Sequence, residues 1–182
     1  MKFMTVLLTL TLNLPVRTQT IPEEAQTAMT MVHVTNTFQF VVPASLERAA
    51  PLFGPDGERC WAGPDWNPVF LHPVPGKDTE GVVFTVQRGE HRSVWVNTIF
   101  DLAAGRMQYV AFLPERLVSI VDVRLKALDA STTRAEVTYA RTALDSSIHA
   151  EVEAMGKKDR ESGPEWQREI VKCLQSSSSP SR

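Results

Sequence analysis

The sequence predicts an α+β protein in which a curved antiparallel sheet of about seven strands wraps around a long C-terminal helix. Between residues 31 and 142, apolar and polar residues alternate in short segments separated by turn-forming residues, which is typical of strands in hairpin succession. From Ile148 to Leu174, apolar residues recur at helical spacing. Wrapping the sheet around this helix buries the inward face of the strands and the apolar stripe of the helix together.

Size and composition favour an ordinary globular domain. The chain has 182 residues and a mass of 20.3 kDa, enough for one domain with a sizeable core. A content of 43% hydrophobic and 22% charged residues argues against a disordered chain or a polytopic membrane protein. The net charge is −2 and no long run of one sign occurs, which argues against a nucleic-acid partner.

The N-terminus carries an apolar run, Phe3–Leu14, directly after Lys2. The run is too short to span a bilayer, and its length fits the apolar core of a signal peptide. We interpret residues 1–20 as a candidate signal peptide and residues 21–30 as a linker. Export would make the protein secreted or periplasmic. The alternative is an apolar extension of a cytoplasmic protein.

Each strand follows from the same alternation. The first, residues 31–42, places Phe38 and Phe40 on one face, and Pro43 ends it. Residues 44–53 are expected to form a short helix, whose length Pro51 limits. The other strands are expected at residues 69–72, 81–88, 93–101, 107–113, 116–127 and 133–142.

The C-terminal helix is expected to begin after Asp145, a suitable N-cap residue. Gly163-Pro164 predicts a break, with proline in the first turn of a renewed helix. The composition of residues 176–182 predicts a disordered tail. The apolar stripe that both halves turn toward the sheet consists of Ile148, Val152, Met155, Trp166, Ile170 and Leu174.

Residues 54–75 connect the short helix to the second strand and contain five prolines, three glycines and two tryptophans. This content excludes a long regular element. Because Trp61, Trp66 and Phe70 carry more apolar area than a solvated loop would, we expect residues 58–72 to form part of a cavity wall or mouth.

In three short segments, residues 52–61, 65–73 and 138–144, the chain resembles an uncharacterised bacterial branch of the SRPBCC superfamily. Leu52–Trp61 (LFGPDGERCW) is similar to its F-x-P-x-G-E-R-x-W segment, which Asp65–Pro73 (DWNPVFLHP) follows. Thr138–Leu144 (TYARTAL) is similar to its T-Y-x-x-T-A-L segment. The resemblance covers residues 31–175, and it departs at Gly163-Pro164, because the last helix of that branch is usually unbroken.

The resemblance implies the START-like helix-grip fold, which birch-pollen-allergen-like proteins and polyketide cyclase/dehydrase relatives share. It also implies a hydrophobic or lipid-like ligand between the sheet and the last helix. It supplies no set of catalytic residues.

No cofactor is predicted. The sequence lacks the His and Cys spacings of a metal site, a G-x-S-x-G nucleophile motif and the glycine fingerprints of phosphate binding. Cys60 and Cys173 are the two cysteines, too few for a disulfide scaffold. In an exported protein they could pair across the fold, and otherwise they would be ordinary thiols.

The candidate catalytic residues are His72, Tyr139 and Glu58. His72 lies between Pro68 and Pro73, and a carboxylate such as Glu58 or Asp65 could hold it as a general acid or base. The alternative is a structural hydrogen bond from His72 to a loop carbonyl. The other histidines, His33, His91 and His149, are expected to be solvated.

Aromatic residues make up most of the candidate ligand site. Strand parity points Phe84, Trp95, Tyr109 and Tyr139 toward the space between sheet and helix. The alternative is that these rings fill the core. The candidate ligand-binding residues are Trp61, Trp66, Phe70, Phe84, Trp95, Tyr109, Tyr139 and Met155.

Three functions remain open from the residues and the resemblance. The favoured one is a module that binds a hydrophobic small molecule or lipid-like ligand. The second is a cofactor-independent cyclase, dehydratase or isomerase acting on a polyketide-like or aromatic substrate. The third is a protein-interaction domain of the co-chaperone type. No integral membrane span is predicted, and the residues carry no prediction of oligomeric state.

Overall fold

A computed structural model describes residues 30–177. The candidate signal peptide, almost all of the linker and residues 178–182 lie outside this range. Within it, no helix is long and apolar enough to cross a membrane.

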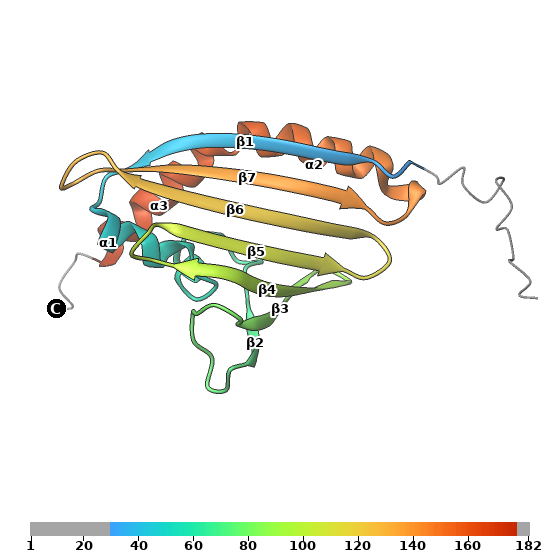
Figure 1. The fold of residues 1–182 in the computed structure, drawn as a ribbon, viewed down its shortest axis with the longest axis horizontal. Coiled ribbons are helices and arrows are strands. Elements are labelled where there is room, and N and C mark those ends of the chain that lie inside the picture. Colours follow the sequence, from blue (N-terminus) through green and yellow to red (C-terminus); the bar gives the residue numbers. More distant parts are fainter. Residues whose placement is uncertain (1–29, 178–182) are drawn as a thin grey trace, which may run out of the picture. The chain divides into compact units, whose positions relative to one another are not determined.

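Seven strands form one antiparallel sheet in the order β1-β7-β6-β5-β4-β3-β2 (Figure 1). Strands β2 to β7 follow one another as neighbours, and β1 lies beside β7, so the predicted hairpin succession is confirmed. The strands are β1 (His33–Val42), β2 (Val69–His72), β3 (Val83–Arg88), β4 (His91–Asp101), β5 (Arg106–Leu113), β6 (Leu117–Ala127) and β7 (Thr133–Ala143).

The β3–β4 hairpin is tighter than predicted. The sequence places a turn over residues 88–92, but Arg88 and His91 already pair across the two strands. Gly89 and Glu90 alone make the turn, and Gly89 has a φ of 57°, which glycine adopts at little cost. Strand β4 therefore begins two residues earlier than the alternation indicates.

Three short helical segments follow β1: α1 (Leu46–Ala49), η2 (Ala50–Phe53) and η3 (Gly57–Cys60). The helix expected over residues 44–53 divides in two because Pro51 lacks the backbone N–H that would continue α1. Gly57 allows η3 to fold back onto η2, since a Cβ at this position would lie 2.0 Å from the carbonyl oxygen of Pro51.

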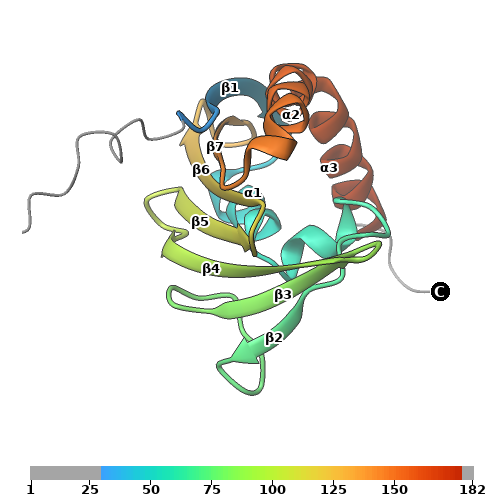
Figure 2. The same ribbon diagram turned by 90° about the vertical axis from the view of Figure 1, so that its right-hand side faces the viewer.

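The C-terminal helix is broken where the sequence predicts. Asp145 caps its start, accepting a hydrogen bond from the backbone N–H of Ser147 at 2.8 Å. The segment η4 (Ser146–Ile148) leads into α2 (His149–Glu161), and α3 (Gly163–Ser177) follows after Ser162. Figure 2 shows α2 and α3 on the concave side of the curved sheet.

The backbones of α2 and α3 approach β1 closely. A Cβ on Gly156 would lie 2.9 Å from the side-chain nitrogen of Asn36, and one on Gly163 would lie 3.0 Å from the carbonyl oxygen of Gln39. Glycine at both positions therefore lets the helix backbones lie against this strand. Each helix also buries an apolar side chain against the sheet. Val152 of α2 is buried near Ala143, and Ile170 of α3 is buried in the main core cluster.

A disulfide joins Cys60, at the end of η3, to Cys173 in α3. The two Cα atoms are 5.7 Å apart and the residues are 113 positions apart in the sequence. The pairing that the sequence left open is therefore present, and it ties residues 54–68 to the last helix.

Val152→Asp should place an unpaired charge in a fully buried site between α2 and the sheet. We expect the free energy of unfolding to fall by roughly 4 kcal/mol or more, measured by urea denaturation. Ala154→Asp, at an exposed site on the same helix, is the matched control and should change stability by less than about 1 kcal/mol. Equal stability of both variants would mean that α2 does not pack on the sheet.

Removing the disulfide should destabilise the fold because its loop spans most of the domain. The double variant Cys60→Ala/Cys173→Ala should lose about 3 to 5 kcal/mol in urea denaturation under non-reducing conditions. A thiol reductant should lower the stability of the wild type and leave that of the double variant unchanged. Equal sensitivity of the two proteins to the reductant would contradict the pairing.

Candidate ligand-binding cavity

A cavity of about 540 Å³ lies between the sheet and the two C-terminal helices. Its floor comes from the inward faces of β4 to β7, with Trp95, Tyr109, Val121 and Tyr139 among the lining residues. No residue of β1 lines it. The helices therefore close over β1 on one side of the sheet and leave space over β4 to β7.

Two walls close the cavity. Residues 58–66 supply one wall through Glu58, Trp61 and Trp66, and the helices supply the other through Met155 and Trp166. The rings of Trp61 and Trp166 meet with centroids 4.8 Å apart, so the two walls touch. The disulfide from Cys60 to Cys173 joins the same two walls covalently.

Four of the lining aromatic residues use their polar atoms within the protein. The indole N–H of Trp61 donates to the Leu52 carbonyl at 2.7 Å and that of Trp66 to the Pro55 carbonyl at 2.9 Å. Trp95 donates to the Ser93 hydroxyl at 2.8 Å, and the Tyr109 hydroxyl donates to the Phe53 carbonyl. Toward the cavity these residues therefore offer mainly apolar ring surface.

Tyr139 differs from these residues because its hydroxyl forms no hydrogen bond with any described residue. Burial raises the pKa of this hydroxyl, and the positive charge of Arg141 opposes the rise only in part. The guanidinium of Arg141 lies 4.2 Å from the centre of the Tyr139 ring. Tyr139 therefore stays protonated at neutral pH and presents a free O–H group.

An ion pair lies at the helix side of the cavity. Arg141 donates two hydrogen bonds to Asp159, at 2.8 and 2.7 Å, and a third to the Ser119 hydroxyl at 3.1 Å. The side chains are 16% and 8% exposed, respectively. This bidentate ion pair satisfies both charged side chains, so neither residue requires a ligand atom as a partner.

Glu58 is the opposite case. Glu58 lines the cavity, and its carboxyl group forms neither a hydrogen bond nor an ion pair with any residue in the range 30–177. Burial raises the pKa of Glu58 well above its usual value, the negative charge of Asp78 adds to the rise, and Arg88 opposes it. The arrangement therefore favours a neutral carboxylic acid, which can donate a proton in a hydrogen bond.

The rim of the cavity is charged. Arg88, His91, Lys158 and Glu165 are exposed residues of the lining. Within residues 30–177, no group of three or more His, Cys, Asp or Glu side chains is placed to hold a metal ion. The arrangement is suited to an apolar molecule with a few polar atoms.

The structure brings together seven of the residues that the sequence proposed for the site. The residues that line the cavity are Glu58, Trp61, Trp66, Trp95, Tyr109, Tyr139 and Met155. Phe84 does not line it, because its ring is buried between Trp66 and Trp95. Phe70, on the neighbouring strand β2, packs against Phe84 and does not line the cavity either. Trp66, from the connection before β2, packs over Phe84 and Val86 of β3, so these inward-facing residues belong to the core.

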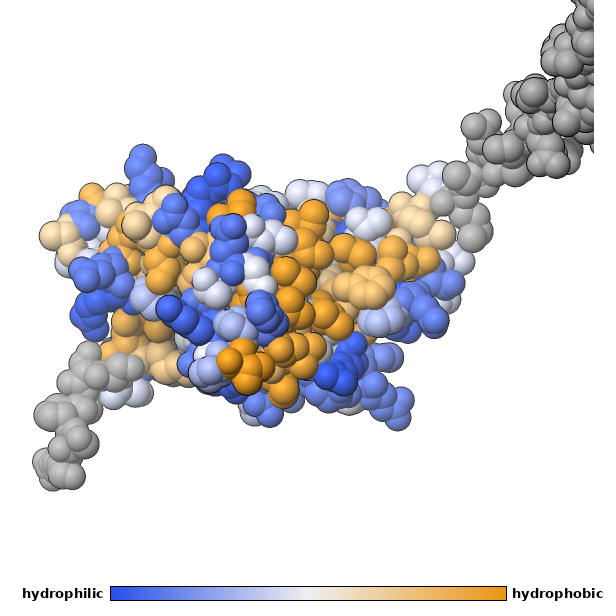
Figure 3. All heavy atoms as spheres, turned by 60° about the horizontal axis from the view of Figure 1, so that its bottom comes forward, coloured by the Kyte–Doolittle hydropathy of each residue, from blue (hydrophilic) through white to orange (hydrophobic). Residues whose placement is uncertain are grey.

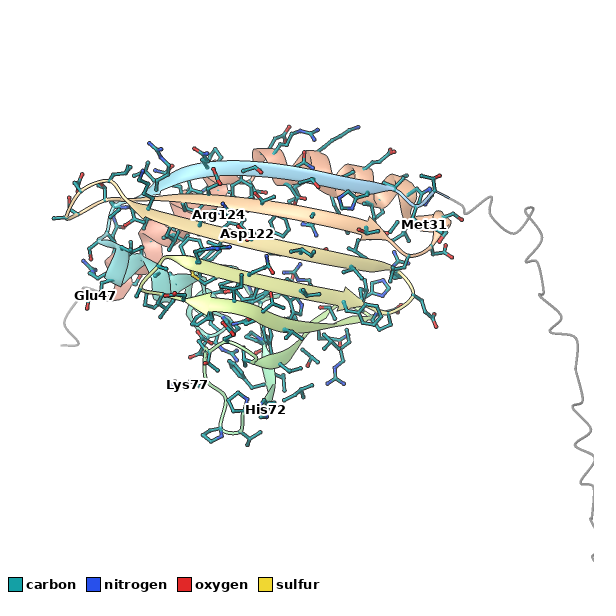
Figure 4. The ribbon with its side chains drawn as sticks, viewed as in Figure 1. Met31, Glu47, His72, Lys77, Asp122 and Arg124 are labelled. Carbon is teal, nitrogen blue, oxygen red and sulfur yellow. A yellow bond between two sulfur atoms is a disulfide. The ribbon has the colours of Figure 1, made fainter. Side chains whose placement is uncertain are left out.

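His72 lies outside the cavity. It is exposed on β2, the last strand of the sheet, as Figure 4 shows. Among the described residues, it forms no hydrogen bond with Glu58 or Asp65. The acid–base pair considered from the sequence is therefore not assembled, whereas Glu58 alone reaches the cavity.

Sequence reasoning missed Arg141, Asp159 and Trp166 as lining residues. A signal for the ion pair was present. Arg141 has the same strand parity as Tyr139, and Asp159 follows Met155 by four positions, so both charges fall on faces that are otherwise apolar. Two opposite charges on facing apolar surfaces indicate a buried pair.

Apolar side chains also gather on the outer face of the sheet. Phe112 on β5 and Ile120 on β6 are exposed, as are Val69 and Leu71 on the edge strand β2. Figure 3 shows apolar surface between hydrophilic residues on the side of the molecule that it displays.

The arrangement is the helix-grip fold, as the sequence resemblance implied. No protein-family model matches the sequence, and no curated protein matches it. The evidence for the fold therefore comes from solved structures.

Three solved structures illustrate the likeness. Norcoclaurine synthase from Thalictrum flavum, in complex with dopamine and hydroxybenzaldehyde, has a TM-score of 0.60 at 11% identity, over 93% of this chain and 99% of that chain. An uncharacterised protein from Rhizobium leguminosarum has a TM-score of 0.58 at 14% identity, over 81% and 97%. Ara h 8.0201 has a TM-score of 0.57 at 15% identity, over 79% and 99%. At these identities the likenesses show the fold.

Glu58→Gln should make the protein more stable at neutral pH. The folded protein holds the Glu58 proton more tightly than the unfolded chain does, so stability falls as pH rises from the ordinary glutamate pKa through the raised pKa of Glu58. The variant lacks this loss, and its advantage should shrink as pH falls toward about 4. Melting temperatures of both proteins between about pH 4 and 8 test this. If the melting temperatures of the two proteins change with pH in parallel, the predicted effect of Glu58 on stability is wrong.

Proposed function

We propose that the protein binds a hydrophobic small molecule or lipid-like ligand in the cavity between β4 to β7 and the C-terminal helices. The observation that carries this proposal is an aromatic cavity of about 540 Å³ in which most aromatic polar groups are already hydrogen-bonded to the protein. Ligand cavities commonly measure about 300 to 1,000 Å³ and are mostly apolar. Desolvation of an apolar ligand would supply most of the affinity.

We place the chain in the uncharacterised bacterial branch of the SRPBCC superfamily on the three sequence segments described above. The fold shared with norcoclaurine synthase supports a small aromatic ligand, since that structure was determined with dopamine and hydroxybenzaldehyde. A disulfide is typical of oxidising compartments. Together with the apolar N-terminal run, the disulfide from Cys60 to Cys173 supports an exported protein.

A second candidate function is catalysis without a cofactor, as a cyclase, dehydratase or isomerase. The unpaired Glu58 carboxyl in the cavity favours it, because a carboxyl with a raised pKa can act as a general acid. Tyr139 is the other protic group available there. Norcoclaurine synthase shows that the fold can support an enzyme.

A third candidate function is contact with another protein. The exposed apolar residues on the outer face of the sheet, including Phe112 and Ile120, favour it. This face is separate from the cavity, so the two functions do not exclude each other.

Native mass spectrometry of purified protein separates the three candidates. A retained small molecule, released on unfolding, would support the binding module, and conversion of that molecule during incubation would support the enzyme. A bound polypeptide with an empty cavity would favour the interaction domain.

Trp61→Ala and Trp66→Ala should each weaken binding of the apolar fluorescent probe N-phenyl-1-naphthylamine by about 1 to 3 kcal/mol. The reason is the loss of ring surface that faces the cavity. Fluorescence titration, corrected for the folded fraction, measures the affinity.

Two controls separate binding from stability. Phe70→Ala removes a ring of the neighbouring cluster that does not line the cavity, and Arg134→Ala removes an exposed charge on β7. Both should leave the affinity of the folded protein unchanged. If the tryptophan variants lower only the stability of the protein, the two tryptophans are core residues, and the probe binds elsewhere or not at all.

A further inference from the structure

The polar groups of the cavity divide into those that are satisfied by the protein and those that are not. Trp61, Trp66, Trp95 and Tyr109 donate to protein oxygens, and Arg141 pairs with Asp159. Away from the charged rim, the lining groups that form no hydrogen bond within residues 30–177 are the Glu58 carboxyl, the Tyr139 hydroxyl and the indole N–H of Trp166. A polar group that lines a cavity without a protein partner remains available to a ligand, so these groups mark where a ligand would be recognised.

The backbone holds Glu58 in a fixed position. Its N–H donates to the Gly54 carbonyl at 2.8 Å, and its own carbonyl accepts from Trp61 and Ala62 at 3.0 and 2.8 Å. Two residues further on, Cys60 is bonded to the last helix. Glu58 therefore lines the cavity from a constrained turn, which reduces the entropy lost when its side chain binds a ligand.

Several charged and titratable groups act on Glu58 or line the cavity with it. Asp78, in the β2–β3 connection, and Arg88, on β3, act on it in opposite directions. Tyr109 on β5 and Tyr139 on β7 would both feel its negative charge. The remaining groups of the lining are Arg141 paired with Asp159, Glu151 paired with Arg116, Glu169 paired with Lys172, and the rim residues His91, Lys158 and Glu165.

We infer that Glu58 binds the ligand as a neutral carboxylic acid that donates a hydrogen bond to an acceptor oxygen, so that the cavity selects uncharged aromatic compounds carrying a carbonyl or ether oxygen. This inference rests on the proposed binding function and adds the chemical class of the ligand. Burial of Glu58 favours the neutral form, and only that form can donate. The Tyr139 hydroxyl is a second donor within the same cavity.

Two fluorescent probes of similar size test the inference. 6-Propionyl-2-(dimethylamino)naphthalene carries a ketone oxygen, and N-phenyl-1-naphthylamine carries no oxygen. Glu58→Ala should weaken binding of the ketone about tenfold and change binding of the amine less than about twofold. Glu58→Gln keeps an N–H donor and should bind the ketone nearly as well as the wild type does. Glu47→Ala, at an exposed site on α1 (Figure 4), is the control and should bind both probes as the wild type does.

The pH dependence gives a second, independent readout. Affinity of the wild type for the ketone should fall as pH rises through the raised pKa of Glu58, because an ionised carboxylate cannot donate. The Glu58→Gln variant should show no such fall, which separates Glu58 from the other titratable groups. Circular dichroism of each variant establishes that it is folded. If Glu58→Ala does not fold, the pH titration of the wild type still tests the inference.

The outcomes distinguish the two proposals. If the wild type binds both probes and Glu58→Ala binds the ketone as tightly as the wild type, the inference about Glu58 is wrong and the binding function stands. If Glu58→Ala does not fold, a wild-type affinity for the ketone that does not change with pH has the same meaning. If the wild type binds neither probe, the proposed binding function fails and the inference fails with it.

Discussion

The close approach of the C-terminal helices to β1 sets the shape of this molecule. At Gly156 and Gly163 no Cβ stands between the helix backbone and the strand, so α2 and α3 lie against one side of the sheet. Because α2 and α3 are held against β1 and the sheet curves away from them, they cannot also fill the concave space over β4 to β7 (Figure 2). The cavity is therefore a consequence of where the helices are held: they lie closest to β1, and the cavity opens over β4 to β7.

Residues 54–68 complete the enclosure and carry much of its chemistry. Too rich in proline and glycine to form a long element, they fold as the short turn η3 and a connection over β3. Trp61 packs on Trp166 and Cys60 is bonded to Cys173, so one segment both closes the cavity and ties it to the last helix. Stability of the fold and position of Glu58 therefore depend on the same contacts.

Two kinds of buried polar group meet in the cavity. Arg141 and Asp159 offset their desolvation through two short hydrogen bonds, which fixes β7 against α2. Glu58 has no such partner among the described residues, and its burial weakens the fold at neutral pH. A carboxyl that lines a cavity without a protein partner is a feature that a ligand can complete, and it is common at functional sites.

The sequence by itself determined the strands and the last helices of this protein, including strand boundaries mostly within two residues, the break before Pro164 and the inward faces of β4, β5 and β7. These features follow from local periodicity, proline chemistry and capping. The sequence placed Trp95, Tyr109 and Tyr139 correctly on the inner face of the sheet. It could not distinguish Phe84, whose inward-facing ring is packed in the core, from the inward-facing residues that line the cavity. Only the tertiary structure decided that residues 54–68 cover β3, that Cys60 reaches Cys173, and that Glu58 enters the cavity while His72 stays outside. The physical reason is that periodicity fixes the direction of a side chain relative to its own strand, whereas the segment that covers that side chain comes from elsewhere in the chain.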